Sequence, residues 1–94
     1  MASIKALKAA QQSLAANVAR LRRRANWTQQ QAADAAQLDV KHLQKLEYGT
    51  LNPSLRTLVR VADAFGVTLA RLLRPTPKRR QRQAIGRPRK APAR

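Results

Sequence analysis

The fold of this chain is decided by residues 27–53, WTQQQAADAAQLDVKHLQKLEYGTLNP. Their pattern predicts two short helices joined by a tight turn. In front of the first helix, the Thr28 hydroxyl can cap free backbone donors while the Gln31 side chain reaches back, which makes a capping box. In front of the second, Asp39 is the expected N-cap, and Gly49 is the residue expected to end that helix.

The second helix has two different faces. At about 100° per residue, Leu43 and Leu46 fall on one side and are expected in the core. The other side carries Val40, Lys41, Gln44, Lys45 and Tyr48. An ordinary solvated helix face usually carries both signs of charge, but this one has no carboxylate. Its amines, amide and phenol can donate hydrogen bonds to phosphates and base edges. The stretch therefore predicts a helix-turn-helix that binds DNA.

Length and charge limit the classes of function. Ninety-four residues make one small domain with a modest core, and 20 Lys and Arg against four Asp and Glu give a net charge of +16. Such a charge favours a polyanionic partner, which leaves DNA, RNA and anionic membranes open. There is no cysteine, which excludes disulfides and fits a cytoplasmic protein.

Other compositional features argue against membranes and organelles. No run of 18 apolar residues is present, so no membrane span is predicted. Binding to a membrane surface is disfavoured because the apolar stripes are needed inside a helical bundle. The first 33 residues lack acids, as organelle transit peptides do, but we prefer to assign them to the fold.

The flanking segments supply three further helices. Residues 3–25 repeat apolar positions about every seven residues, interrupted by Gln11, with Arg20, Arg23 and Arg24 opposite and Asn26 suited to a left-handed helix end. This stripe consists of Ile4, Leu7, Leu14, Val18, Leu21 and Ala25. In the first helix of the predicted helix-turn-helix, residues 32–36 include four alanines, whose small side chains make this helix narrow.

Two more helices follow the loop at Asn52 and Pro53. Ser54 should cap a helix that ends at Gly66, and Thr68 a short last helix. The apolar positions expected inside are Leu55, Leu58, Ala62 and Phe65 in the first of these, and Leu69, Leu72 and Leu73 in the second.

The last 20 residues differ in composition. They hold eight basic side chains, no acid and four prolines, without an apolar period, and are expected to be disordered when free. We therefore divide the chain into residues 1–12, an extension of the first helix, residues 13–74, the folded domain, and residues 75–94, a disordered basic tail.

Within the tail, GRPRK at residues 86–90 resembles an AT-hook, in which Arg87 would enter the minor groove. Ile85 stands where such a hook has arginine, so a generic polybasic arm is the alternative. The expected DNA contacts of the tail are Lys78, Arg79, Arg80, Arg82, Arg87, Arg89 and Lys90.

From about Leu14 to Leu73 the chain resembles the Cro/C1-type (XRE) helix-turn-helix family. The resemblance rests on LRRRANWTQQQAADAA at residues 21–36, LxxLExG at residues 43–49 and NPSLRTLVRVADAFGVTLARLL at residues 52–73. It implies an all-α, five-helix, lambda-repressor-like domain that binds double-stranded DNA.

The resemblance also implies roles for single residues. Arg22 and Glu47 match an ion pair that ties the first helix to the third, and Gln29 matches a glutamine that braces the recognition helix and contacts a phosphate. The positions that face base edges in the major groove are Val40, Lys41, Gln44 and Lys45. Lysine suits guanine, glutamine suits adenine, and valine can only meet a thymine methyl. The expected phosphate contacts are Thr28, Gln29, His42, Tyr48, Thr50 and Asn52.

Three positions depart from the family pattern or allow another interpretation. Gln37 stands where the turn usually has glycine, so it must accept a left-handed backbone or force a different turn. Ala32 replaces a large aliphatic residue, and Trp27 is expected to fill the space in the core rather than stack on a base. A metal or catalytic role for His42 is disfavoured, because the chain offers it no partners.

These residues lead to one function and two alternatives. No catalytic set or metal-ligand set is present, so we expect neither an enzyme nor a cofactor. We predict a sequence-specific transcription regulator on the nucleoid in the cytoplasm, acting as a homodimer on inverted half-sites. The dimer contact is expected from Ile4, Leu7 and Leu14 or from Leu69, Leu72 and Leu73. The alternatives are an architectural, nucleoid-type protein and an antitoxin that represses its own operon with a toxin as partner.

Overall fold

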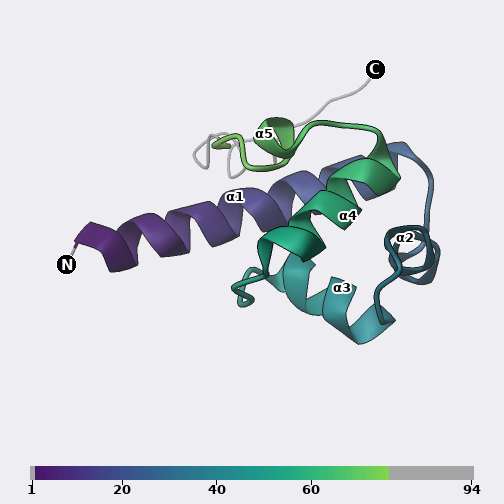
Figure 1. Cartoon of the computed structure of the whole chain (residues 1–94), viewed down its shortest axis with the longest axis horizontal. Helices are drawn as coiled ribbons and strands as arrows, with labels where there is room; N and C mark the ends of the chain where they lie inside the picture. Colours follow the sequence, from purple (N-terminus) through teal and green to yellow (C-terminus); the bar gives the residue numbers. More distant parts are fainter. Residues whose placement is uncertain (1, 77–94) are drawn as a thin grey trace, which may run out of the picture.

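The structure is a computed structural model that describes residues 2–76, with side chains from residue 4 onward. These residues form five helices and no strand: α1 (Ala2–Arg24), α2 (Gln29–Ala36), α3 (Val40–Tyr48), α4 (Leu55–Phe65) and α5 (Leu69–Leu72). In Figure 1, α1 crosses the molecule, and its first turns project beyond the other helices. The all-α, five-helix domain with a long first helix is confirmed. Predictions for residues 77–94 lie outside the described residues.

The helices begin and end largely where the sequence predicts. The Thr28 hydroxyl accepts from the Gln31 amide at 3.0 Å, and the Thr28 amide donates to the Gln31 side chain at 2.8 Å, which completes the capping box. Ser54 and Thr68 cap α4 and α5 through their side chains. Asp39 holds the N-cap position of α3, but its side chain makes no capping hydrogen bond.

The turn between α2 and α3 follows the first of the two alternatives for Gln37. This residue adopts a left-handed backbone, with φ 60° and ψ 46°, and Asn26 after α1 does the same with φ 60°. The Leu38 amide donates to the Ala33 carbonyl at 2.8 Å and closes the turn. The Leu38 side chain packs against the core, which fixes α3 relative to α2.

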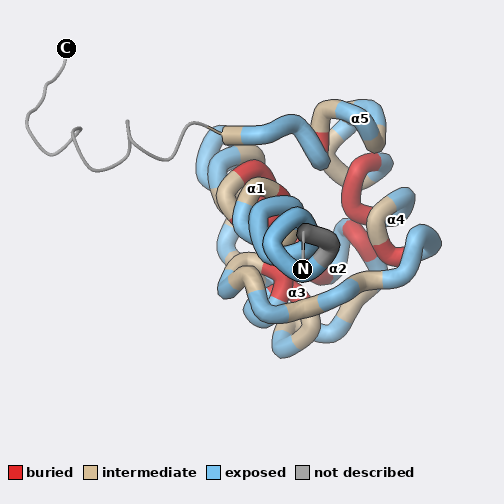
Figure 2. The backbone as a smooth tube through the Cα atoms, turned by 90° about the vertical axis from the view of Figure 1, so that its left-hand side faces the viewer, coloured by how far each residue is buried: buried red, intermediate tan, exposed pale blue. Residues whose placement is uncertain are grey.

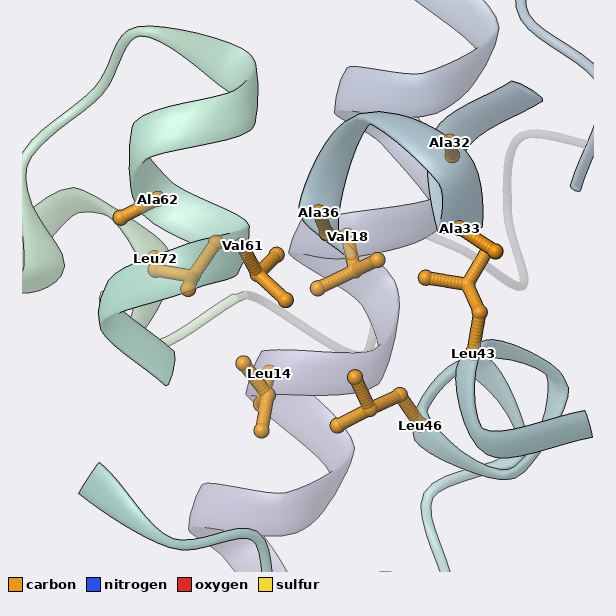
Figure 3. Packing of buried hydrophobic residues seen from close by; sticks show 10 residues of the cluster. All are labelled: Leu14, Val18, Ala32, Ala33, Ala36, Leu43, Leu46, Val61, Ala62 and Leu72. Carbon is orange, nitrogen blue, oxygen red and sulfur yellow. The ribbon is translucent and has the colours of Figure 1, made fainter. Parts of the chain in front are cut away.

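The core lies where the helices meet, as the buried residues of Figure 2 show. Side chains from all five helices point into this common centre (Figure 3). The cluster comprises Leu14, Val18, Ala32, Ala33, Ala36, Leu43, Leu46, Val61, Ala62 and Leu72. The small side chains of α2 allow it to approach α3 and α4 closely. Trp27 packs at the edge of the cluster, 5.4 Å from the Phe65 ring between centroids, as expected for a core residue.

Two expectations of burial are wrong, for Leu55 of α4 and for Leu73 after α5, which is 39% exposed. Leu55 is 64% exposed, whereas Val61 and Thr57 of the same helix are buried. Because α4 carries apolar residues on most of its circumference, periodicity alone does not select the buried face, and packing against α2 and α5 does. On α1, the first turns extend past the bundle, so Ile4 and Leu7 are exposed and available for the expected dimer contact, and Ala25 is exposed beyond the end of the helix.

No helix within residues 2–76 has the length and apolar character needed to cross a bilayer.

Candidate nucleic-acid interface

The outer face of α3 is open and basic. Lys41, Gln44, Lys45 and Tyr48 are all exposed and line one shallow depression. Tyr48 is 84% exposed, an unusually large fraction for an aromatic side chain. This face carries donors and no carboxylate, so it complements acceptor groups.

Val40 does not belong to the open face to the same degree. It is the first residue of α3, and its half-buried side chain packs against the core cluster. A helical side chain leans toward the N-terminus of its helix, which here brings Val40 toward the turn after α2. The structure therefore places three of the four expected base-reading residues fully at the surface.

A two-point ion pair fastens α3 to α1. The Arg22 Nε donates to Glu47 Oε2 at 2.6 Å, and Nη2 donates to Oε1 at 3.1 Å. The same guanidinium donates through Nη1 to the Trp27 carbonyl at 3.0 Å. The side chains of Arg22 and Glu47 are only 17% and 9% exposed, so each largely shields the other's charge from solvent. The pair keeps the only carboxylate of α3 turned away from the open face.

Hydrogen bonds extend from this ion pair to the open face. The Gln29 Nε2 donates to Glu47 Oε1 at 3.1 Å, and the Gln44 Nε2 donates to Gln29 Oε1 at 3.2 Å. An ionised carboxylate only accepts, so Glu47 requires the nitrogen of Gln29, and Gln29 then presents its oxygen to Gln44. Gln44 keeps one N–H and its carbonyl oxygen for another partner. The orientation of the Gln44 amide therefore depends, through Gln29 and Glu47, on Arg22 of α1.

The other expected phosphate contacts are distributed around α3. Thr28, Thr50 and Asn52 are exposed at the start of α2 and in the loop after α3, and Gln29 is half-buried. His42 differs, because its Nε2 is enclosed and has no hydrogen-bond partner among the described residues. That nitrogen is enclosed within the domain, and the expected phosphate contact of His42 stays a prediction. Within residues 2–76, no group of three His, Cys, Asp or Glu could hold a metal.

Sequence reasoning missed two polar side chains of α1. The Gln11 Nε2 donates to the Leu51 carbonyl at 2.9 Å and ties the loop after α3 to α1. Asn17 is 6% exposed, and its Nδ2 donates to the Leu72 carbonyl at 2.8 Å and the Arg74 carbonyl at 2.9 Å. A polar residue within an apolar stripe was the available signal, since buried amides need partners.

Comparisons with known proteins agree with this geometry. A helix-turn-helix family model matches residues 18–72. Over 60 residues the chain is 38% identical to an uncharacterised HTH-type transcriptional regulator, y4dJ, of Sinorhizobium fredii, covering 64% of this chain and 78% of that protein. Over 41 residues it is 49% identical to the HTH-type transcriptional regulator DdrOP3 of Deinococcus deserti, covering 44% of this chain but only 32% of that protein.

A solved structure has the same arrangement of helices. The hypothetical transcription factor NHTF from Neisseria superposes with a TM-score of 0.68 at 28% sequence identity. The match covers 79% of this chain and 84% of that one. The likeness therefore extends beyond the two helices around the turn to most of the domain.

Proposed function

This chain belongs to the Cro/C1-type helix-turn-helix family of DNA-binding transcription regulators, and from that premise we propose that it recognises a specific operator by docking α3 in the major groove. One observation carries the proposal. The open face of α3 is free of acids, and its central glutamine is oriented by hydrogen bonds that begin at the Arg22–Glu47 ion pair. Such an arrangement limits the conformations of a reading side chain before DNA arrives.

Three exposed side chains are proposed to read bases. Gln44 still offers one N–H and its oxygen, the pair of groups that matches N7 and N6 of adenine. Lys41 and Lys45 can donate to guanine acceptors. Val40 is proposed to add only a thymine methyl contact through the exposed part of its side chain.

Backbone contacts are proposed on both sides of these residues. The groups proposed to reach phosphates are the exposed Thr28, Tyr48, Thr50 and Asn52 and the half-buried Gln29. Contacts of this kind fix the position of the protein on the duplex, and base contacts then discriminate between sequences. For the basic residues of the tail, the proposal of phosphate and minor-groove contacts rests on the sequence alone.

We also propose that the protein acts as a homodimer on two inverted half-sites. Leu14 and Leu72 are buried, so they are not available for contact between subunits. The exposed apolar residues Ile4, Leu7, Leu55, Val59 and Leu73 remain. Leu7, Leu58 and Leu73 line a small groove of about 110 Å³. We define this groove and the five exposed residues as the apolar patch and propose that a second copy covers it. The pair would work on the nucleoid in the cytoplasm.

Selection of binding sites from random duplexes at physiological salt tests the main proposal. The expected result is one enriched motif with a recognisable half-site. Equal recovery of all sequences would contradict it and favour an architectural, nucleoid-type protein. The net charge of +16 is the observation that favours this second function, because phosphate contacts alone bind DNA without regard to sequence.

A further inference from the structure

The loop after α3 has two sides. Along residues 49–54 the odd-numbered residues are half-buried and the even-numbered ones are exposed. This alternation is typical of an extended backbone, in which successive side chains point in opposite directions. Thr50 and Asn52, the two residues of this loop that we propose to contact phosphates, lie on its exposed side. Their positions therefore depend on what holds the half-buried residues beside them.

The half-buried side of the loop rests on α1. A Cβ atom added to Gly49 would lie 3.6 Å from the Ala15 Cβ and 3.8 Å from the Gln11 carbonyl oxygen, so the backbone of Gly49 packs closely against α1. Two residues later, the Gln11 Nε2 donates to the Leu51 carbonyl at 2.9 Å. Thr50 is thereby held through both of its neighbours in the chain.

The same glutamine lines the groove of the apolar patch. Gln11 lies there with Leu7 of α1, and Asn52 and Pro53 of the loop line the groove as well. The hydrogen bond from Gln11 to Leu51 is only partly buried, so water competes with it while the groove is open. A second copy that covers the groove excludes this water, and a hydrogen bond is stronger in such an environment of low dielectric constant.

We propose that Gln11 is the positioning residue for the phosphate contacts of Thr50 and Asn52, and that a second copy seated in the groove strengthens these contacts by protecting the hydrogen bond from Gln11 to the loop. The inference rests on the proposed function, in both the docking of α3 and the pairing of two copies. The loop has two states, held on α1 and released from it, and pairing favours the held state. Binding to the phosphates favours pairing in return, because a coupling between two sites is reciprocal.

Duplexes in which a neutral methylphosphonate replaces one phosphate at a time measure these contacts. The loop phosphates are those whose replacement lowers the affinity of the wild-type protein but not that of Thr50→Val or Asn52→Ala, and all other contacted phosphates serve as the reference. If no phosphate meets this criterion, the inference falls together with the loop contacts. An operator motif selected from random duplexes would then still support the docking of α3.

The positioning role is tested with Gln11→Met, which removes the donor but keeps an unbranched apolar side chain in the groove. Replacement of a loop phosphate should cost the wild-type protein about tenfold or more in affinity and Gln11→Met only about twofold, because a released loop loses its charged hydrogen bonds. The cost at reference phosphates should be the same in both proteins. The matched control is Gln30→Met on α2, which should keep the wild-type cost at the loop phosphates. Equal changes at all phosphates, or none, would overturn the positioning role.

The coupling is tested with the wild-type protein on a duplex with one half-site and on a duplex with both. Replacement of a loop phosphate should cost about fivefold more affinity when two copies are bound, and Leu7→Glu should remove this difference. Equal costs on the two duplexes would overturn the coupling, whether or not Gln11→Met folds. Without DNA, Gln11→Met should have the same mass by light scattering as the wild-type protein, since its groove stays apolar. A lower mass would show that Gln11 belongs to the contact between copies and is not a positioning residue.

Discussion

Gln29 illustrates how one side chain connects stability with recognition. The resemblance to the family implied two roles for it, a phosphate contact and a brace, and the structure contains the brace. Its nitrogen is bonded to Glu47 and its oxygen to Gln44, so both ends of the amide are engaged within the protein. One N–H remains for a phosphate. A DNA contact at this hydrogen would therefore also hold the orientation of Gln44.

At this scale the first prediction concerns base preference. Gln44→Ala should reduce discrimination at a single position of the operator by about 1–3 kcal/mol, or roughly 5–150-fold, because the bidentate partner of adenine is lost. The loss of discrimination is measured by comparing the affinities of both proteins for the selected site and for its single-position variants. The matched control is Gln30→Ala, an exposed glutamine of α2 that is bonded to Asp34 rather than to α3. An unchanged preference in Gln44→Ala would remove this residue from the proposed reading set.

At the scale of elements, the turn between α2 and α3 holds α3 in place at some cost in backbone strain. Gln37 has a left-handed backbone that L-residues other than Asn, Asp and Gly rarely adopt. The family pattern has glycine there because glycine reaches this conformation without a clash. The strain persists because Leu38 is packed in the core and its amide closes the turn.

A glycine substitution tests this account. Gln37→Gly should stabilise the domain by about 0.5–1 kcal/mol, since relief of the left-handed strain exceeds the entropy lost by glycine on folding. Gln30→Gly, at the second residue of α2, should instead destabilise the domain by up to about 1 kcal/mol. Urea denaturation of both variants, followed by circular dichroism, shows whether each substitution raises or lowers the free energy of unfolding. A destabilised Gln37→Gly would show that the glutamine side chain itself stabilises the turn, in addition to the role of its backbone.

At the scale of the whole molecule, charge is divided between a folded body and a basic segment. Residues 77–94 hold eight of the 20 Lys and Arg. Deletion of residues 77–94 should weaken binding to every duplex and flatten its salt dependence, with up to about 0.9 in slope lost for each phosphate released. The preference between operator and random DNA should be retained, because the residues proposed to read bases are all on α3. Titrations at several salt concentrations on both duplexes measure the two quantities. If the deletion abolished the preference itself, the tail would have to read sequence.

The apolar patch gives a second prediction at this scale. Leu7→Glu should shift the protein toward a monomer, because a carboxylate would be buried against the apolar groove of the second copy. Light scattering after size exclusion, at tens of micromolar and with or without a palindromic duplex, reports the mass. The control is Ala35→Glu, an exposed position on α2 outside the patch. A wild-type monomer under both conditions would rule out the proposed pairing.

The sequence by itself determined the five helices, their caps and the acid-free face of α3. These are local properties, because capping residues, apolar spacing and side-chain chemistry act within one or two helical turns. Only the tertiary structure decided that α4 buries Val61 rather than Leu55, and that Gln29 orients Gln44. It also decided that Asn17 holds the segment leading to the tail beside α3. These contacts join residues 15–57 positions apart. Their existence depends on how helices pack against one another, which the period of a single helix does not specify.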